Sequence, residues 1–539
     1  MKILSDLKMY GRFAWGLRDF LRHTITLDEA KTIVRQRMVE REANFLLVVN
    51  RGIYGYLKSP YLPLLKLAGC QIGDIEAMVR NKGLESTLLA LRESGIYFTF
   101  EEFKGLEPVV RNGRHIPVKV HDFDNPFLRQ SYEGESGGTA TGAGTRVQIE
   151  LNHLVNRVPY QLLSSEIHGL LGVPTAIWFG VLPDPSGISN VLRGAHAGNI
   201  PEKWFSPVLS REIRPSLKNR LANQMILTVG RAFGTPLPDP EPVHLDQAAI
   251  VAQWVVQSLK THGACLIRTH VSKALRICLS AQKEGLDFRG ATFMGGGEVP
   301  TPTKVREITR TGARWIPIFS FAEAGSVGIG CAQPLDPNDL HFLKDSLALV
   351  LYPRQVPGTK TTVNALTLTT LLPTAPKVML NVETDDYGVI ETRSCGCGWE
   401  TYGFHDHIRS LRSFRKLTGE GVTLIGSEMV HILEEVLPAR FGGSPLDYQL
   451  MEEEDEKGFT RLTLIVSPKI NIPDETKLSE VILEALGKGS DSADLSRAMW
   501  NQAKTLRVKR MEPIWTDRGK LMPLHLVHHP KESKGVSKS

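Results

Sequence analysis

The spacing of apolar residues predicts an amphipathic helix near the start of the chain. Thr26 and Glu29 have the hydroxyl-x-x-carboxylate spacing of a capping box, and apolar residues recur at helical intervals from there to about Asn50. Further helices are predicted over residues 302–311, 427–437 and 476–486, and β-rich runs over residues 314–319, 377–382 and 460–466. Helical and β-rich segments alternate up to about residue 400, which favours an α/β fold.

The length of the chain predicts more than one domain. A chain of 539 residues with 42% hydrophobic content exceeds the size at which a single core normally keeps growing. The residue pattern changes near 400–420, after which the order of elements is that of a small α+β domain. We therefore predict a large α/β domain at residues 1–410, a small mobile α+β domain at 411–525 and a disordered polar tail at 526–539. The acidic run at 452–456 is expected to be a solvated turn.

Charge and apolar windows exclude several classes of protein. The net charge of +6 arises from 64 basic and 58 acidic residues, an excess too small to predict a nucleic-acid-binding face. The first ten residues lack the pattern of a signal peptide, and no apolar window reaches the length of a membrane span. We expect a cytoplasmic protein without a membrane span. Its 6 cysteines are then expected to be buried or to bind metal rather than to form disulfides.

A loop of small and hydroxyl residues is the first candidate for binding chemistry. Such a loop presents backbone N–H groups and hydroxyls with little side-chain bulk, which suits a polyphosphate, although many loops of this composition are only flexible connections. It lies just before the alternating stretch 147–151 and contains Ser136, Gly137, Gly138, Thr139, Thr141 and Gly142. No Gly-Lys-Ser/Thr follows it and no strand-linked G-x-G-x-x-G is present, which disfavours P-loop and dinucleotide-binding folds.

This loop resembles the phosphate loop of the adenylate-forming superfamily, which contains acyl-CoA synthetases, non-ribosomal adenylation domains and luciferases. The usual pattern is Ser-Ser/Gly-Gly-Thr-Thr-Gly; here Ala140 is an extra residue, and Arg146 is the nearest cation where the family has a lysine. Further motifs of the superfamily follow in the family's order between residues 130 and 520. The resemblance implies a large N-terminal domain that binds ATP and the acid, with a mobile C-terminal cap.

Two motifs near the middle of the chain resemble the adenine and magnesium sites of this superfamily. The segment 319–323, Phe-Ser-Phe-Ala-Glu, is similar to the Tyr-Gly-x-Thr/Ser-Glu motif, in which the glutamate holds the magnesium of MgATP and the aromatic residue lines the adenine site. The resemblance gives these roles to Glu323 and Phe319. The turn 295–298, Gly-Gly-Gly-Glu, resembles the turn that lies along the adenine, which implicates Gly297 and Glu298. A surface glutamate at a strand end and a tight turn are the alternatives.

Three further positions carry the resemblance towards the C-terminus. The segment 383–386 is similar to the Thr-x-Asp motif, whose aspartate accepts hydrogen bonds from the ribose hydroxyls, and this implicates Asp386. Arg412 corresponds to the hinge arginine, although the hinge acids are replaced by an aromatic and a basic residue. Lys520 lies in a Gly-Lys loop similar to the one that brings a catalytic lysine into the site for adenylation. An exposed lysine in a glycine turn is the alternative.

Within the superfamily the chain most resembles phenylacetate-coenzyme A ligases, whose N-terminal signature is similar to residues 58–63. Some members of that branch carry zinc near the nucleotide pocket. The resemblance implies a zinc site formed by Cys331, His341, Cys395 and Cys397, and these residue types are standard tetrahedral zinc ligands. Buried thiols and a tight turn are the alternative. Residues 405–407, His-Asp-His, are expected to be solvated or to belong to the hinge.

The resemblance implies an enzyme that converts a carboxylic acid and ATP to an acyl-adenylate and pyrophosphate, and then transfers the acyl group to a thiol, first of all coenzyme A. Its cofactors would be ATP, Mg2+, coenzyme A and a structural Zn2+, and relatives of this kind are often homodimers. Two alternatives stay open: transfer of the acyl group to a protein or an amine, and a nucleotide-binding homologue without catalysis. The sequence does not identify the acid.

Overall fold

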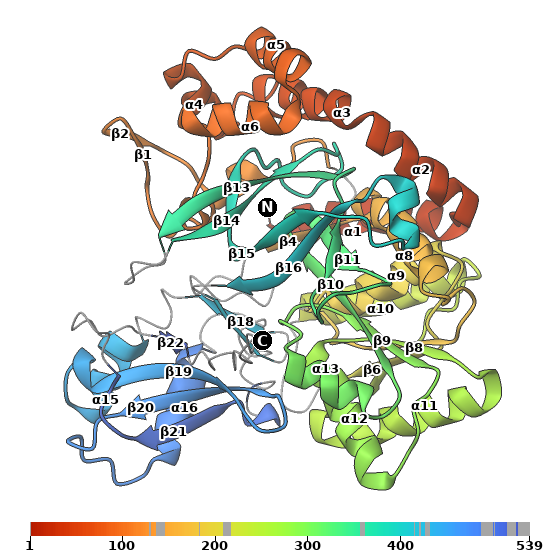
Figure 1. The fold of residues 1–539 in the computed structure, drawn as a ribbon, viewed down its shortest axis with the longest axis vertical. Helices are drawn as coiled ribbons and strands as arrows, with labels where there is room; N and C mark the ends of the chain where they lie inside the picture. The colour runs from red at the N-terminus through yellow and green to blue at the C-terminus, as the bar shows by residue number, and fades with distance from the viewer. Residues whose placement is uncertain are drawn as a thin grey trace, which may run out of the picture.

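The computed structural model describes residues 2–128, 131–135, 146–182, 184–207, 217–355, 362–413, 416–419, 422–425, 432–486, 500, 502–514 and 524–526. A large α/β body and a smaller C-terminal α+β part, with its own sheet, are visible in Figure 1. The predicted fold class is confirmed. The predicted domain limits stay a prediction, and the last strand of the large sheet reaches Ser413.

Helices dominate the first hundred residues. Thr26 caps the predicted helix with the predicted capping box, in which its side chain and that of Glu29 accept from each other's backbone. The helix is broken at Glu40 rather than continuing to Asn50. The helices of this region are α1 (Lys2–Arg22), α2 (Leu27–Val39), α3 (Arg41–Val48), the π-helix η1 (Val49–Tyr54), α4 (Tyr61–Leu67), α5 (Ile72–Lys82), α6 (Leu84–Glu93) and α7 (Phe100–Lys104). Two short hairpins and a 3-10 turn follow: β1 (Val109–Arg111) with β2 (Arg114–Ile116), η2 (Val120–Phe123), and β3 (Ser131–Glu135) with β4 (Arg146–Glu150).

The body is built on a 12-stranded sheet of order β13-β14-β15-β16-β12-β11-β10-β9-β8-β5-β6-β7. Its parallel half contains β5 (Thr175–Trp178), β6 (Lys203–Ser206), β7 (Pro240–Pro242), β8 (Cys265–Arg268), β9 (Ala291–Gly295) and β10 (Arg314–Phe321). Its antiparallel half contains β11 (Gly325–Gly330), β12 (Leu340–Phe342), β13 (Leu347–Gln355), β14 (Thr362–Thr370), β15 (Val382–Thr392) and β16 (Asp406–Ser413). Strand β10 joins the halves, because it pairs in parallel with β9 and antiparallel with β11.

The predicted strand at residues 377–382 is wrong. The strand of this region, β15, begins only at Val382. Upstream of it, backbone groups bond outside the sheet: Val378 N donates to the Phe123 carbonyl and Leu380 N donates to the Tyr61 hydroxyl. These long-range partners satisfy the backbone N–H groups without a ladder of paired strands. The apolar pattern alone therefore could not show whether this segment is a strand or an irregular buried segment.

The parallel half reverses its direction of winding between β5 and β8. From β5 the chain proceeds outward to β6 and β7, and it then returns to place β8 on the other side of β5, followed by β9 and β10. In open parallel sheets, ligands bind outside the carboxyl ends of the strands at such a switch point. The helices of this region are α8 (Leu151–Ile167), α9 (Ser186–His196), α10 (Leu217–Ala232), the 3-10 turn η3 (Leu245–Gln247), α11 (Ala248–His262), α12 (Val271–Glu284) and α13 (Pro302–Thr309). Helix α13 and strand β10 confirm two of the sequence predictions.

The C-terminal part has a four-stranded sheet of order β21-β20-β19-β22. Its elements are β17 (Lys416–Gly419), β18 (Val422–Ile425), the π-helix η5 (Ile432–Val436), α15 (Leu437–Phe441), η6 (Pro445–Asp447), β19 (Tyr448–Glu454), β20 (Thr460–Val466), α16 (Thr476–Leu486), β21 (Leu506–Arg510) and β22 (Leu524–Leu526). The predicted strand 460–466 and helix 476–486 are confirmed. The predicted helix 427–437 lies partly outside the described residues. The predicted solvated turn is wrong for the first three residues of the acidic run, because β19 extends to Glu454; the turn begins after that strand, and Glu456 lies in it.

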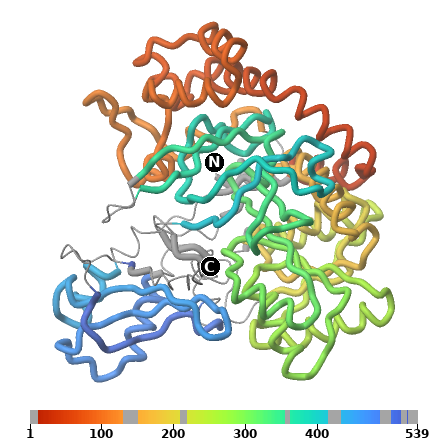
Figure 2. Tube along the Cα trace, viewed as in Figure 1, coloured from red at the N-terminus to blue at the C-terminus, as the bar shows by residue number. Residues whose placement is uncertain are grey.

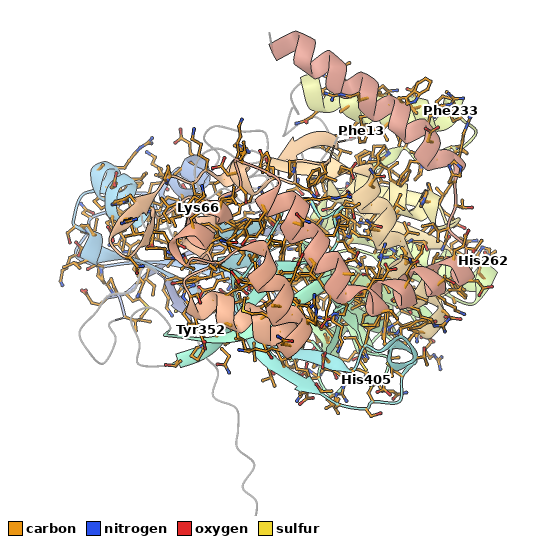
Figure 3. All side chains as sticks on the ribbon, turned by 90° about the horizontal axis from the view of Figure 1, so that it is seen from above. Phe13, Lys66, Phe233, His262, Tyr352 and His405 are labelled. Carbon is orange, nitrogen blue, oxygen red and sulfur yellow. The ribbon has the colours of Figure 1, made fainter. Side chains whose placement is uncertain are left out.

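The C-terminal sheet packs beside α12 and α13 of the body, as the tube in Figure 2 shows. Lys304 Nζ of α13 donates to Thr460 Oγ1 at 3.0 Å, and the Arg276 guanidinium of α12 lies 4.6 Å from the ring centroid of Phe459. In Figure 3, which shows the side chains from above, Phe13 lies on helix α1 and Phe233 lies beside that helix. Among the described residues, no helix is long and apolar enough to cross a membrane.

Candidate active site and metal centre

A cavity of about 300 Å³ lies outside the carboxyl ends of the central parallel strands. Phe179 directly after β5, Arg268 at the end of β8 and Gly295 at the end of β9 form part of its wall, and Ile318 of β10 closes one side. Residues of α8 and α9 cover it from above the strand ends. The cavity therefore occupies the switch point between β5 and β8, where the topology alone predicts a ligand site.

The triple-glycine turn forms a wall on which no side chain fits. A Cβ atom at Gly295 would lie 1.6 Å from the Thr269 carbonyl oxygen, and one at Gly296 would lie 2.0 Å from the Ile318 carbonyl oxygen. Gly297 has a φ of +81°, in the left-handed region that favours glycine. The turn brings bare backbone to the cavity surface, which suits close contact with a flat group. Gly297, predicted to contact the nucleotide, lies on the cavity wall.

The predicted aromatic and magnesium motif reaches the same cavity. Ser320, Phe321 and Ala322 line it, at the point where β10 turns into β11. Phe319 does not belong to the described lining; its ring packs edge-on against that of Phe321, with centroids 5.6 Å apart. The aromatic ring that the structure places on the cavity is therefore that of Phe321, two residues after the one predicted.

Glu323 lies immediately beyond this turn and is paired with lysines. Its carboxylate accepts from Lys104 Nζ of α7 at 2.5 Å, and Lys377 lies nearby. Burial alone would raise the pKa of Glu323, but the two lysines outweigh it and lower the pKa to about 2. Glu323 is thus an ionised carboxylate directly after Ala322, the last lining residue of this segment. Its role as a magnesium ligand stays a prediction, and that role requires the metal to displace Lys104.

Glu298, the other predicted acidic residue, is buried beneath the glycine turn. Its carboxylate accepts a short hydrogen bond from the Ser272 hydroxyl and lies 3.7 Å from Lys304 Nζ. Lys304 also bonds to Thr460 of the C-terminal sheet. Glu298 therefore connects the turn to helices α12 and α13 and, through Lys304, to the C-terminal part. Its predicted contact with adenine stays a prediction.

Asp386 and Arg412 lie on neighbouring strands, β15 and β16, away from the described cavity lining. Asp386 Oδ1 accepts from Ser413 Oγ at 2.8 Å. Arg412 lies close enough to Glu452 of β19 to influence the pKa of that carboxyl group. Burial raises the pKa of Glu452 to about 7, and the positive charges of Lys304 and Arg412 oppose that rise. Arg412 thus borders the C-terminal sheet, as a hinge residue would. Its nucleotide contact and that of Asp386 stay predictions.

Several predicted residues lie outside the described part of the chain. They are the six residues of the phosphate loop, Ser136, Gly137, Gly138, Thr139, Thr141 and Gly142, together with Lys520. Their predicted roles are not tested by the structure.

Three arginines on the cavity wall were missed by the sequence analysis. Arg157 comes from α8, Arg193 from α9 and Arg268 from the end of β8. The available signal was weak, because a charged residue that ends an apolar strand, as Arg268 does, is also common at exposed sheet edges. The convergence of three chain segments could not be read from spacing.

The four predicted zinc ligands come together between β11, β12 and the loop that precedes η4 (Gly398–Tyr402). The sulfur atoms of Cys331 and Cys397 are 4.0 Å apart, and His341 Nε2 lies 3.1 Å from the Cys397 sulfur and 3.6 Å from the Cys395 sulfur. Tetrahedral zinc at ordinary bond lengths requires sulfur–sulfur distances of about 3.8 Å and nitrogen–sulfur distances of about 3.5 Å. The residues therefore fit a zinc ion without rearrangement of the backbone.

His407 is a fifth candidate ligand that the sequence analysis misplaced. It was expected to be solvated or part of the hinge, but it is fully buried in β16, directly opposite His341 of β12. Its Nδ1 bonds to Asp339 Oδ1 at 2.7 Å, and its buried Nε2 has no hydrogen-bond partner among the described residues. His407, Cys331, His341 and Cys395 each offer a ligand atom, and these atoms lie within 4.8 Å of one another. A histidine held by a carboxylate through its other nitrogen is the usual arrangement of a metal ligand.

The hydrogen bonds of the cluster agree with the chemistry of such a donor set. His341 Nδ1 bonds to the Phe404 carbonyl at 2.7 Å, so this nitrogen carries the proton and Nε2 presents its lone pair to the thiols. The hydrogen bond from the Cys331 thiol lowers the pKa of Cys397, against the effect of burial. The Cys397 sulfur and the His341 imidazole thus face one another, in the arrangement that can bind a metal ion.

No protein-family model and no curated protein matches the sequence. Among solved structures, the anthranilate CoA ligase AuaEII in complex with anthranoyl-AMP is 12% identical, with a TM-score of 0.34 over 72% of this chain and 65% of that chain, just under two thirds of its length. An amide bond synthetase from Marinactinospora thermotolerans is 11% identical, with a TM-score of 0.40 over 89% and 92%. An acyl-CoA synthetase (AMP-forming)-like protein from Dyadobacter fermentans is 11% identical, with a TM-score of 0.29 over 83% and 95%.

The solved structures that the chain resembles are adenylate-forming enzymes, the superfamily that the sequence motifs indicate. The phenylacetate-coenzyme A ligase branch stays a prediction.

Proposed function

We propose that this protein activates a carboxylic acid with ATP, forming an acyl-adenylate and pyrophosphate, and then transfers the acyl group to a thiol, first of all coenzyme A. One observation carries the proposal. The glycine turn 295–297 and the segment 320–322, two motifs that resemble parts of one nucleotide site, line the same cavity although a helix separates them in the sequence. That cavity lies at the switch point of the sheet.

The chemistry explains what such a site has to supply. A carboxylate is a poor acyl donor, and its attack on the α-phosphate of ATP brings two anions together. Catalysis therefore depends on holding the reactants in line and on neutralising charge. Magnesium bound with ATP supplies part of that neutralisation. In the proposal, the bare backbone at Gly296 would contact the adenine, Glu323 would hold the metal, and Lys520 would supply positive charge to the reacting carboxylate and phosphate.

The proposed zinc centre has a structural role. It would connect the β11–β12 hairpin to the loop before η4 and to β16. Along the chain, strands β13, β14 and β15 separate that hairpin from the loop and from β16. The centre contains Cys331, His341, Cys395 and either Cys397 or His407. A site closed by four protein ligands leaves no open position for a substrate, which distinguishes it from catalytic zinc.

Exchange of labelled pyrophosphate into ATP tests the adenylation step. We expect exchange that depends on a carboxylic acid, measured over a panel of aryl, aliphatic and amino acids. No exchange with any acid, in a protein that still binds ATP, would support the nucleotide-binding homologue instead.

Release of AMP in the presence of different acceptors tests the second step. Acceleration by coenzyme A supports the thiol ligase. Acceleration by an amine or by an acceptor protein, with no effect of coenzyme A, would move the assignment to the alternative acceptor class.

A further inference from the structure

Three guanidinium groups converge on the cavity from separate elements. Arg157, Arg193 and Arg268 all line it, and each is close enough to the others to influence their titration. As a whole residue, Arg268 is 6% exposed. Arg157 is of intermediate exposure. All three side chains form part of the cavity wall.

The described residues give hydrogen bonds to two of these cations but no opposite charge. Arg157 Nε donates to the Ser326 hydroxyl at 3.2 Å, and Arg193 donates to the Asn190 side chain at 2.9 Å and to the Ser189 carbonyl at 3.2 Å. These partners are uncharged. Among the residues that the structure describes, no acidic side chain forms an ion pair with any of the three arginines, and Arg268 donates no side-chain hydrogen bond to a described residue.

The described carboxylate on the cavity wall is that of Glu150, and it is already engaged. Glu150 caps α8 by accepting from the His153 backbone at 2.9 Å, and it also accepts from the Asn152 side chain at 3.0 Å. The lining therefore has three guanidinium groups against one carboxylate. His153 adds no positive charge, because burial and then the nearby arginines lower its pKa to about 3.

Such an arrangement is costly without an anion. Burial lowers the pKa of Arg157 and of Arg268 to about 10, and the pKa of Arg193 falls through burial and through repulsion by the other two. Buried charges in proteins are ordinarily paired, because desolvation is not otherwise compensated. Arginine is also the side chain whose fork geometry binds carboxylate and phosphate groups through two parallel hydrogen bonds. The cavity is thus built to receive negative charge.

We propose that the acid accepted by this cavity carries a second anionic group, a further carboxylate or a phosphate, which Arg157, Arg193 and Arg268 bind while the reacting carboxylate is presented to ATP. The proposal rests on the proposed function for the identity of the reaction. It adds the substrate class: dicarboxylic or phosphorylated acids rather than simple aryl or fatty acids. The glycine turn lines the same cavity with bare backbone, which leaves room there for the remainder of the substrate.

Binding without ATP tests the anion site separately from the reaction. Isothermal titration would compare acids of one skeleton that differ only in the second group: hexanoate with hexanedioate, benzoate with benzene dicarboxylates, and glycerate with phosphoglycerate. We expect the second anionic group to tighten binding about 10- to 100-fold, as charge-assisted hydrogen bonds do. The dicarboxylate and phosphate pairs then show which of the two anions is preferred.

Variants connect that preference to the arginines. Arg268→Gln and Arg193→Gln are expected to lose the preference for the second anionic group and to raise the KM for the diacid in pyrophosphate exchange, with the KM for ATP unchanged. The matched control is Arg80→Gln, at an exposed position of α5, which should behave as the wild type. Melting temperatures confirm folding, and removal of a poorly paired buried cation should not lower them.

Each outcome decides one of the two proposals. Diacids that bind no better than monoacids, in an enzyme that adenylates monoacids, overturn the substrate class and leave the proposed function in place. Tight, arginine-dependent binding of diacids with no pyrophosphate exchange supports the anion site and overturns the proposed function. A rise in the KM for ATP alone in Arg268→Gln places the arginines at the nucleotide and overturns the substrate class.

Discussion

Replacement of Gly295 by alanine is expected to damage both the stability and the activity of this protein. The added Cβ would lie 1.6 Å from the Thr269 carbonyl oxygen, where an ordinary contact begins at 3.4 Å. The clash is with backbone at the end of β8, so no side-chain rotation relieves it. Strands β8 and β9, paired in register here, must separate, and the glycine wall moves with them.

The size of the effect follows from that displacement. Overpacking a well-packed core typically costs about 1–3 kcal/mol, and the required shift places this substitution at the upper end. A shift of about 1 Å in groups that position a substrate can lower a rate about 100-fold. We therefore expect Gly295→Ala to lower the melting temperature and to reduce acid-dependent pyrophosphate exchange by at least that factor.

A matched control is available in the same chain. Gly73, near the start of helix α5, has nothing within 4 Å of an added Cβ, and Gly73→Ala should leave activity unchanged while stability stays the same or rises by up to about 1 kcal/mol. Thermal unfolding and pyrophosphate exchange would be measured on both variants. If Gly295→Ala is as stable and as active as Gly73→Ala, the packed glycine wall and its role in the site are refuted.

Three further predictions concern the metal centre, the lysine Lys520 and the buried glutamate Glu323. Purified protein should contain about one zinc per chain, and Cys395→Ser should lower both the zinc content and the melting temperature, whereas Cys70→Ser should change neither. Lys520→Ala should lower adenylate formation about 100-fold or more and retain transfer from supplied acyl-AMP, as expected for loss of one preorganised charge. Because the pKa of Glu323 lies at about 2 against an ordinary 4.5, its ionised form contributes stability that is present above pH 4.5 and is lost as the pH falls towards 2. The free energy of unfolding in urea should therefore decrease between pH 6 and pH 3 by about 2 kcal/mol more in the wild type than in Glu323→Gln.

The controls for these predictions are equally specific. Cobalt substitution counts the thiolate ligands through the intensity of sulfur-to-cobalt charge transfer: three if Cys397 completes the site, and two if His407 replaces it. Protein that contains no zinc, with a Cys395→Ser variant as stable as the wild type, contradicts the metal centre. Lys509→Ala, at an exposed position of β21, should keep full adenylation, and equal loss of both half-reactions in Lys520→Ala argues against its assigned role. Equal pH slopes for the wild type and Glu323→Gln would show that the lysines do not depress the pKa of Glu323.

Local signals in the sequence determined several elements of the fold. The capping box at Thr26 begins α2, and Thr301 with Pro302 at the first helical position begins α13. Helix 476–486 is found with the predicted limits. These features depend on hydrogen bonds and apolar spacing within one or two turns, so the sequence contains all the information that they need. Strand pairing depends on partners far away in the sequence, which is why the predicted strand at 377–382 was wrong.

The same distinction applies to the site. Residue types in family order indicated the glycine turn, Glu323 and the four zinc ligands, because a recurrent chemistry constrains which residues occur at which spacing. Only the tertiary structure placed Phe321 rather than Phe319 on the cavity, brought His407 opposite His341, and assembled Arg157, Arg193 and Arg268 from two helices and a strand end. Such convergence depends on the order and register of a 12-stranded sheet, and that arrangement is set by packing between distant segments rather than by any local pattern.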